Sequence, residues 1–294
     1  MNHRNPHLDQ IDTDYLYHLG LDSSMDLEAM FGDVKYVCMH GSPVRAETFA
    51  KKTAGNLGLA VSAESIQPIG KTERFSMYKV GPVLSISHGM GMPSVSILLH
   101  EVTKLMEYAG ATNFSFIRIG TSGGVGAEAG DVIISDKGLN PDLGEKFRTT
   151  VLGNKREYDT HLDLELAQRI LANRGQFQAC IASTVGTDDF YEGQGRMDGA
   201  LAPDYTEEEH MIWLQKIYAA GGRNMEMECT QFAAFCKRAG IPAAIVCVAL
   251  LNRLKGDQVT STPEQLAEFS DRAQTVVLNF IRQDLAALKK EVEA

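Results

Sequence analysis

The sequence predicts an α/β fold in which one sheet is covered by helices on both faces. Three observations support this prediction. Short apolar runs alternate with segments of helical periodicity, the apolar runs are nearly continuous, and glycine-rich turns follow several of them. Strands that are apolar along their whole length are buried on both sides, so helices must pack above and below the sheet.

The elements of the first half follow from these patterns. Glycine and proline divide the strands from the helices, as at Gly41-Ser42-Pro43 and at the Gly81-Pro82 turn. The helix over 94–108 carries its apolar side chains at helical spacing, beginning with Val95, Leu98 and Leu99. The expected strands are 33–40, 74–80, 83–87, 114–119 and 132–135, and a further helix runs from 43 to about 50.

The second half continues the alternation. We expect helices over 161–172 and 206–220, a short extended segment at 225–228, a helix from there to about 239, and a long closing helix from Thr262 or Pro263. Strands are expected at 179–184 and 243–251. Residues 1–30 lack periodicity and are expected to form an extended arm. Because composition does not shift and no repeat occurs, residues 1–294 are interpreted as one domain.

Charge and composition exclude several classes of protein. The net charge of −10 disfavours nucleic-acid binding, because an acidic surface repels a phosphate backbone. Five cysteines without a CxxC pair indicate neither a disulfide framework nor a zinc ribbon. The N-terminus lacks the apolar region of a signal peptide, and no apolar run reaches the roughly 18 residues that a membrane span needs. We therefore expect a cytoplasmic protein with no nucleic-acid or membrane partner.

Two glycine-containing loops are candidates for anion binding. In Gly41-Ser42-Pro43-Val44-Arg45 a helix start offers free backbone donors beside an arginine, although an ordinary strand–helix loop with a surface arginine explains this segment better when it is taken alone. In Arg118-Ile119-Gly120-Thr121-Ser122-Gly123-Gly124 an arginine interrupts an apolar strand, and a buried guanidinium needs an anionic partner. That partner is either a bound phosphate or an internal carboxylate, and the residues alone leave both open.

Two further loops carry groups that suit a nucleoside. Gln194 can donate and accept hydrogen bonds and Arg196 donates, which matches a pyrimidine edge, while Phe190 can stack on a base. Alternation over residues 224–228 places Glu226 and Glu228 on one face of an extended segment, where carboxylates can accept from a ribose diol. The alternatives are a polar surface loop for the first, and a glycosidase carboxylate pair or the polar side of a half-buried strand for the second.

The four loops, in this order, resemble those of the uridine phosphorylases, which belong to class I of the nucleoside phosphorylase family. The similarity rests on IRIGTSGG, DDFYEGQGR, NMEMEC and LLNRLKGDQ, and it extends from about Tyr15 to the C-terminal helix. The stretch TERFSMYKVGPVLSISHGMGMPS resembles the dimeric animal-type branch. The resemblance implies a three-layer α/β/α fold with a mixed central sheet, and a homodimer with shared active sites in which the N-terminal arm contacts the partner.

The resemblance also implies a role for each matching residue. Phosphate would be bound by Gly41, Arg45, Arg118 and Thr121, with Arg74 contributed by the neighbouring subunit. Ribose would be bound by Glu226, Met227 and Glu228, with His18 contributed by the neighbour. Uracil would be bound by Ser122, Gly123, Phe190, Gln194, Arg196, Leu250, Leu251 and Arg253. Arg118, Arg196 and Glu228 are expected to be the catalytic residues.

The implied reaction is the reversible phosphorolysis of uridine to uracil and ribose 1-phosphate, a step of pyrimidine salvage. Inorganic phosphate is then a co-substrate, and no cofactor or metal is expected. Bacterial relatives hold a monovalent cation through a glutamate at the position of Phe75, so we expect no such cation here. Purine-cleaving relatives carry an aspartate at the position matching Asn252, which is a poor proton donor.

Three other functions remain open from the sequence. A nucleosidase of the same fold would use water in place of phosphate and would not need Arg45, Arg74 and Arg118. A purine nucleoside phosphorylase is disfavoured by Gln194 and Arg196. A nucleoside-binding protein without activity would have no need to retain both the phosphate and the ribose residues.

Overall fold

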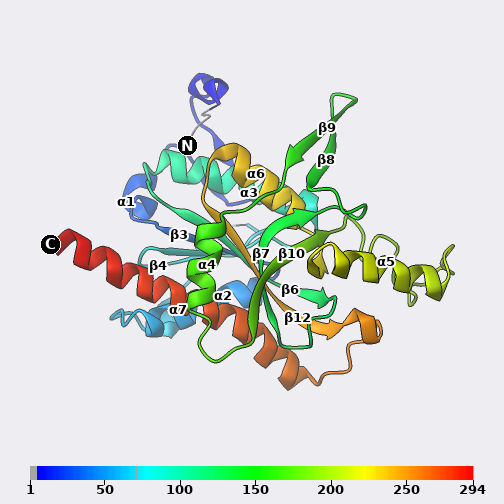
Figure 1. Ribbon diagram of the computed structural model, residues 1–294. Coiled ribbons are helices and arrows are strands. Elements are labelled where there is room, and N and C mark those ends of the chain that lie inside the picture. The colour runs from blue at the N-terminus through cyan, green and yellow to red at the C-terminus, as the bar shows by residue number, and fades with distance from the viewer. Residues whose placement is uncertain (1–4, 71, 294) are drawn as a thin grey trace.

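Eight strands form the central sheet of the computed structural model, which describes residues 5–70 and 72–293 (Figure 1). Their order across the sheet is β11-β10-β7-β12-β6-β3-β5-β4. The bounds are β3 (Tyr36–His40), β4 (Met77–Val80), β5 (Val83–Ser87), β6 (Ser115–Gly124), β7 (Val132–Leu139), β10 (Ala179–Gly186), β11 (Gly222–Glu226) and β12 (Ala243–Asn252). Each apolar run that the sequence marks as a strand lies in this sheet.

The sheet is mixed and closes on itself at one end. Strand β12 runs parallel to β6 but antiparallel to β7, and β4 runs antiparallel to β5. Strand β11 also pairs with the distal end of β6, with Asn224 opposite Gly124 and Met225 opposite Gly123. This additional pairing joins β11, β10, β7, β12 and β6 into a barrel-like ring, and β3, β5 and β4 extend from it. The mixed sheet implied by the resemblance is confirmed.

Helices cover both faces, which confirms the three-layer fold. On one face α1 (Leu27–Phe31), α3 (Met92–Tyr108) and α6 (Cys229–Ala239) pack their apolar side chains against β3, β5, β6 and β12. On the other face lie α2 (Pro43–Asn56), α4 (Leu164–Ala172) and α7 (Pro263–Glu293). Figure 1 shows these two layers above and below the sheet, with α5 (Glu207–Ala219) to one side. Leu214 and Ile217 of α5 pack against Val185 and Met225 of the ring.

The strand directions bring the predicted loops to one edge of the sheet. Strands β3, β5, β6 and β12 are mutually parallel where they pair, so their carboxyl ends lie together. Gly41 follows β3, Gly89 follows β5, and the glycines after Arg118 form the distal part of β6. In α/β sheets this edge is where ligands bind.

Three segments differ from the sequence prediction. Strand β6 continues through Gly124, because β11 and β12 both pair with the glycine-rich segment that was expected to be a turn. A hairpin of β8 (Lys146–Val151) and β9 (Asn154–Asp159) was not predicted, and Figure 1 shows it projecting from the body. The N-terminal arm contains a short 3-10 helix, η1 (Pro6–Gln10), and the pair β1 (Tyr15–Leu16) and β2 (Leu21–Asp22). Within the described ranges, no helix combines the length and the apolar character that a membrane span requires.

Candidate active site

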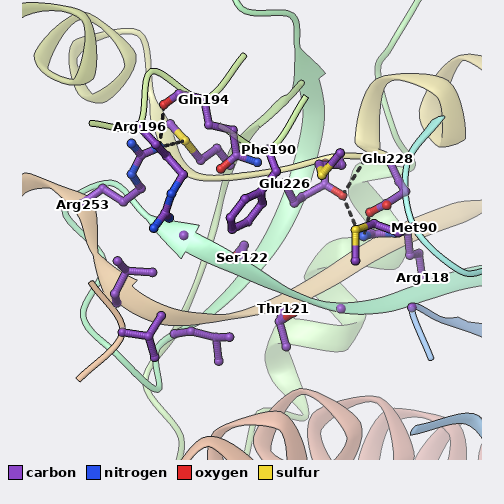
Figure 2. A pocket seen from close by; sticks show the side chains of 18 of the residues that line it. Met90, Arg118, Thr121, Ser122, Phe190, Gln194, Arg196, Glu226, Glu228 and Arg253 are labelled. Carbon is purple, nitrogen blue, oxygen red and sulfur yellow. Dashed lines mark hydrogen bonds and ion pairs between the residues drawn. The ribbon is translucent and has the colours of Figure 1, made fainter. Parts of the chain in front are cut away.

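A pocket opens at the carboxyl edge of the sheet. Every residue that the resemblance implies for the site lines it, apart from His18 and Arg74. Figure 2 shows that the pocket has two ends. Gln194, Arg196 and Arg253 lie at one end, Arg118, Glu226 and Glu228 lie at the other, and Phe190 and Ser122 lie between them.

Arg118 is held between two carboxylates at the deep end of the pocket. Its Nη1 lies 2.7 Å from Glu226 Oε2, and its Nη2 forms an ion pair with Glu228 Oε2. The guanidinium is 3% exposed, so these charges are removed from solvent together. The internal-carboxylate interpretation of Arg118 is therefore true, and the residue also lines the pocket as the phosphate interpretation requires.

Glu226 and Glu228 do not lie in one secondary-structure element, so the prediction of one extended segment that contains both is wrong. Strand β11 ends at Glu226, and Glu228 precedes the first residue of α6. The Glu226 carboxylate accepts hydrogen bonds from the backbone N–H groups of Glu228 and Cys229, at 3.0 and 2.8 Å. It thus binds the start of α6, where an anion is favoured. Burial raises the pKa of Glu226 to about 7.

Glu228 is the carboxylate with capacity left for a ligand. Its Oε1 accepts from the backbone N–H of Gly91 at 2.5 Å. Gly91 has φ +86°, a conformation that favours glycine and that allows its N–H to face the carboxylate. Burial opposes the charge on Glu228, but Arg118, His88 and the hydrogen bond from Gly91 together outweigh it and keep the pKa below the usual value for glutamate. An ionised Glu228 can accept hydrogen bonds from hydroxyl groups through its remaining lone pairs.

Arg45 enters the same end of the pocket without a carboxylate partner. Ser42 caps α2 and accepts from Arg45 Nε at 3.2 Å, while Arg45 Nη1 donates to Thr121 Oγ1 at 3.4 Å. Among the residues that the structure describes, Arg45 forms no ion pair. Its burial and the neighbouring Arg118 lower its pKa. A half-buried cation of this kind is stabilised by an anionic ligand.

Gln194 presents unused hydrogen-bonding groups at the other end. The residue is 3% exposed, yet its side-chain amide forms no hydrogen bond with any described part of the chain. Its backbone carbonyl accepts from Arg253 Nη1 at 2.7 Å. A buried carboxamide normally has partners, so Gln194 has the capacity to bind a ligand that offers both a donor and an acceptor.

Arg196 lies beside Gln194 with part of its guanidinium already engaged. Asp198 binds it through two hydrogen bonds, from Nε at 2.8 Å and from Nη2 at 2.6 Å. Nη2 also donates to the backbone carbonyl of Asp257 at 2.8 Å. The guanidinium stacks on Phe190, with 4.8 Å to the ring centroid. Nη1 has no partner in the described ranges, so it is the donor that remains for a base.

Ser122 and Asn252 use their polar groups within the protein. Ser122 Oγ donates to the backbone carbonyl of Val248 at 3.2 Å and accepts from Asn224 at 2.9 Å. Asn252 accepts from the backbone of Gly126 and Leu254 and donates to Glu128. Asn252 does not line the pocket.

His18 and Arg74 lie outside the pocket of their own chain. Glu101 accepts from the backbone N–H of His18 at 2.9 Å and contacts its Nδ1 at 2.6 Å, which fixes the ring. Phe75, next to Arg74, lies 6.1 Å from the His18 ring. The Arg74 side chain is exposed and forms no ion pair with any described residue.

Five residues of the pocket were not predicted from the sequence. Gly89, Met90, Gly120, Met225 and Val259 line it. A signal for the first two existed, because Gly89-Met90-Gly91 follows β5 just as Gly41 follows the parallel strand β3. Asp198 and Asp257 hold the arginines from short sequence distances, Asp198 beside Arg196 and Asp257 four residues after Arg253. The contact of Arg196 with the backbone of Asp257, 61 positions away, could be found only from the fold.

Comparisons with known proteins place the chain in a family. The family model described as the phosphorylase superfamily matches residues 35–283. Uridine phosphorylase 1 of Mus musculus is 44% identical over 286 residues, which are 96% of this chain and 92% of that protein. A crystal structure of uridine phosphorylase from Schistosoma mansoni in complex with uracil superposes with a TM-score of 0.91 at 38% identity, covering 95% of this chain and 98% of the other.

The fold and the two-ended pocket thus define a member of the phosphorylase superfamily. Within it, the chain belongs to the uridine phosphorylase family. One relative, 36% identical over 95% of both chains, is the inactive uridine phosphorylase B of Schistosoma mansoni. Family membership alone therefore does not establish activity, which has to be argued from the residues of the site.

Proposed function

We propose that this protein is an active uridine phosphorylase, which cleaves uridine with inorganic phosphate to give uracil and ribose 1-phosphate. One observation carries the proposal. A single pocket contains unused hydrogen-bonding groups suited to a pyrimidine at one end, on Gln194 and Arg196, and an arginine without a carboxylate, Arg45, at the other. The uracil-bound structure of the Schistosoma mansoni relative supports a base site of this kind.

Gln194 and Arg196 suit the edge of uracil. The base presents a carbonyl, an N–H and a second carbonyl in a row, and a carboxamide beside a guanidinium supplies matching donors and an acceptor. Both groups are positioned before the substrate arrives, because Arg253 holds the backbone of Gln194 and Asp198 holds Arg196. A buried site of this type rejects bases that leave its polar groups unpaired, by as much as about 10⁴-fold.

The reaction forms a bond between a phosphate oxygen and C1′ as the bond from C1′ to N1 of uracil breaks. The electron pair moves onto the uracil ring, which later takes a proton from water at N1. Arg196 Nη1 and the Gln194 amide stabilise the negative charge that develops on the base, as donors do in an oxyanion hole. Arg45 and Arg118 hold phosphate beneath the sugar, and the phosphate charge in turn stabilises the cationic sugar.

Glu228 accepts hydrogen bonds from the ribose hydroxyls in this arrangement. Its carboxylate already accepts from Gly91 and pairs with Arg118, so its orientation is fixed. Glu226 does not bind ribose directly in this account. Its oxygens are engaged by Arg118 and by the start of α6, so it orients Arg118 and Glu228.

The charge balance of the phosphate end supports a site shared between two subunits. Arg45 and Arg118 face Glu226 and Glu228, so with both carboxylates ionised one chain alone supplies no net positive charge for a phosphate dianion. Arg74 of a partner subunit would add the missing charge, and the partner's His18, held by the partner's Glu101, would close the ribose side. His18 and Arg74 lie outside their own pocket, as this arrangement needs.

The decisive experiment measures uracil release from uridine by the purified protein with and without phosphate, and with inosine as a parallel substrate. We expect release from uridine that depends on phosphate. Release without phosphate would identify a nucleosidase, and cleavage of inosine instead would identify a purine phosphorylase. Binding of uridine without release would place the protein with its inactive relative.

A further inference from the structure

The motif LLNRLKGDQ ends in Asp257 and Gln258, to which the proposed reaction assigns no role. We propose that Asp257 is a positioning residue for the base, supported by Gln258, and that it fixes Gln194 and Arg196 relative to each other. The inference rests on the proposed function, because it names how the base site of that reaction is held in place. Neither residue lines the pocket, so both act through the residues they contact.

The Asp257 carboxylate joins two segments of the site. Its Oδ1 accepts from Arg253 Nε at 2.8 Å, and its Oδ2 accepts from the backbone N–H of Met197 at 3.2 Å. Arg253 lies in the 3-10 turn that follows β12, whereas Met197 follows Arg196 in the loop after β10. Each oxygen thus binds a different segment, and one rigid carboxylate sets the distance between the two segments.

The first connection extends to Gln194. Arg253 is almost fully buried, and its Nη1 donates to the backbone carbonyl of Gln194 at 2.7 Å. Asp257 is the carboxylate that pairs with this guanidinium. It therefore fixes the arginine that in turn fixes the backbone of the base-reading glutamine. Figure 2 shows Arg253 and Gln194 side by side at this end of the pocket.

The second connection extends to Arg196. The backbone carbonyl of Asp257 accepts from Arg196 Nη2 at 2.8 Å, and Gln258 Nε2 donates to Asp198 Oδ2 at 2.5 Å. Asp198 also binds Arg196 through Nε and Nη2. The engaged nitrogens leave Nη1 as the free donor, so residues 257 and 258 determine which edge of the guanidinium faces the base.

The test compares Asp257→Asn with the wild-type enzyme and with Glu268→Gln. Glu268 forms a bidentate pair with Arg272 on α7 and does not line the pocket, so it is a matched arginine–carboxylate control. In Asp257→Asn the side chain keeps its size, but an amide nitrogen replaces one of the two oxygens. This nitrogen cannot accept a hydrogen bond, so the connection to either Met197 or Arg253 is lost. We expect kcat/KM for uridine to fall about 10²-fold, because small displacements of binding groups carry costs of that order.

Kinetic constants measured separately for uridine and for phosphate distinguish a positioning role from a loss of folded enzyme. We expect the KM for uridine and the Kd for uracil to rise in Asp257→Asn, with the KM for phosphate unchanged. Unfolding of part of the sample would lower kcat alone. Gln258→Ala alters an exposed side chain and gives a milder version of the same result, a several-fold rise in uridine KM, should Asp257→Asn fail to fold.

Two results would overturn the inference: a wild-type kcat/KM for uridine in both variants, or a parallel rise in the KM values for uridine and phosphate. The proposed function is judged separately, from the wild-type assay. If the wild type releases no uracil, the titration of uracil into each variant still decides whether Asp257 positions the base site.

Discussion

Arg118 Nη1 and Glu226 Oε2 form an ion pair 2.7 Å apart at the deep end of the pocket, where both side chains are 3% exposed. Glu226 belongs to β11 and Arg118 to β6, so the pair joins the two strands whose additional contact closes the ring. Removal of the Glu226 carboxylate leaves Glu228 as the remaining carboxylate partner of the buried Arg118 guanidinium. It also leaves the backbone N–H groups at the start of α6 without their acceptor.

We predict that Glu226→Ala lowers the free energy of unfolding by about 3 kcal/mol, as expected when one partner of a buried pair is lost. Urea denaturation measures the change. Glu268→Ala, which breaks an exposed pair with Arg272, should cost less than about 1 kcal/mol. Equal effects in the two variants would show that the buried pair contributes no more than a surface pair.

Arg45→Ala should raise the KM for phosphate by roughly 10- to 10²-fold, because a charge-assisted hydrogen bond contributes about 1.5–3 kcal/mol. Arg45 contacts Ser42 and Thr121 and has no described carboxylate partner, so its removal leaves no unpaired anion in the free enzyme. The affinity for uracil should not change. Arg148→Ala, on the exposed β8–β9 hairpin, serves as the control. A loss of uracil affinity in Arg45→Ala would contradict the assignment of the two ends.

The sequence predicts the layers and the pocket well because both depend on local patterns. The apolar stripe of α3, beginning with Val95, Leu98 and Leu99, is fully buried. Gly41 follows β3, and Gly120 lies in the distal part of the parallel strand β6. Their convergence at one edge of the sheet therefore follows from the fold class. The resemblance then assigns the individual residues of the pocket, and the structure brings them together.

The remaining features depend on pairings between distant segments. The segment from Gly120 to Gly124 was interpreted as a turn, and only its contacts with β11 and β12 keep it extended. The residues alone could not choose between phosphate and a carboxylate for Arg118, because Glu226 and Glu228 lie more than a hundred positions away. Asp198 and Asp257 resemble ordinary loop residues until their contacts with Arg196 are seen.

Arg196→Ala should abolish uridine cleavage while leaving phosphate binding intact. The Nη1 donor for the base is lost, whereas Arg45 and Arg118 occupy the other end of the pocket (Figure 2). Turnover and phosphate titration of the same preparation give the two readouts. If phosphate binding also disappears, the division of the pocket into a base end and a phosphate end is wrong.

The attachment of the N-terminal arm should weaken in acid. Asp14 accepts from Lys104 Nζ at 2.7 Å and from the Tyr108 hydroxyl at 2.8 Å, and both partners belong to α3. Burial opposes the charge, but these two donors prevail and lower the pKa of Asp14 below its usual 3.8. The folded state therefore binds fewer protons here than the unfolded state, so this stabilisation is present above pH 3.8 and is lost as the pH falls further.

We predict that Asp14→Asn lowers the free energy of unfolding by about 1–2 kcal/mol near neutral pH. The difference from the wild type should shrink as the pH falls below 3.8, where the wild-type carboxyl also becomes neutral. Urea denaturation over this pH range measures it. A difference that stays constant down to the most acidic point would show that the charge of Asp14 plays no part.

Complementation between two variants with weakened phosphate binding tests the shared site, at a phosphate concentration low enough that each variant alone retains little activity. Arg74→Ala removes the cation that we propose for the partner's pocket, and Arg45→Ala removes one from its own pocket. In a mixed dimer, the Arg74→Ala subunit retains its own Arg45 and receives Arg74 of the partner subunit, so one site is complete. After random exchange half of the dimers are mixed and each has one complete site, so activity should return to about a quarter of the wild-type value.

The alternative arrangement gives the opposite result. If Arg74 served its own chain, each site in a mixed dimer would lack one arginine and no activity would return. The two variants are mixed after mild dissociation, and uracil release is compared with that of each variant treated alone. Arg148→Ala mixed with Arg45→Ala controls for the dissociation treatment, since the number of complete sites does not change on mixing. Recovery only in the Arg74 and Arg45 mixture establishes that Arg74 acts across the subunit interface.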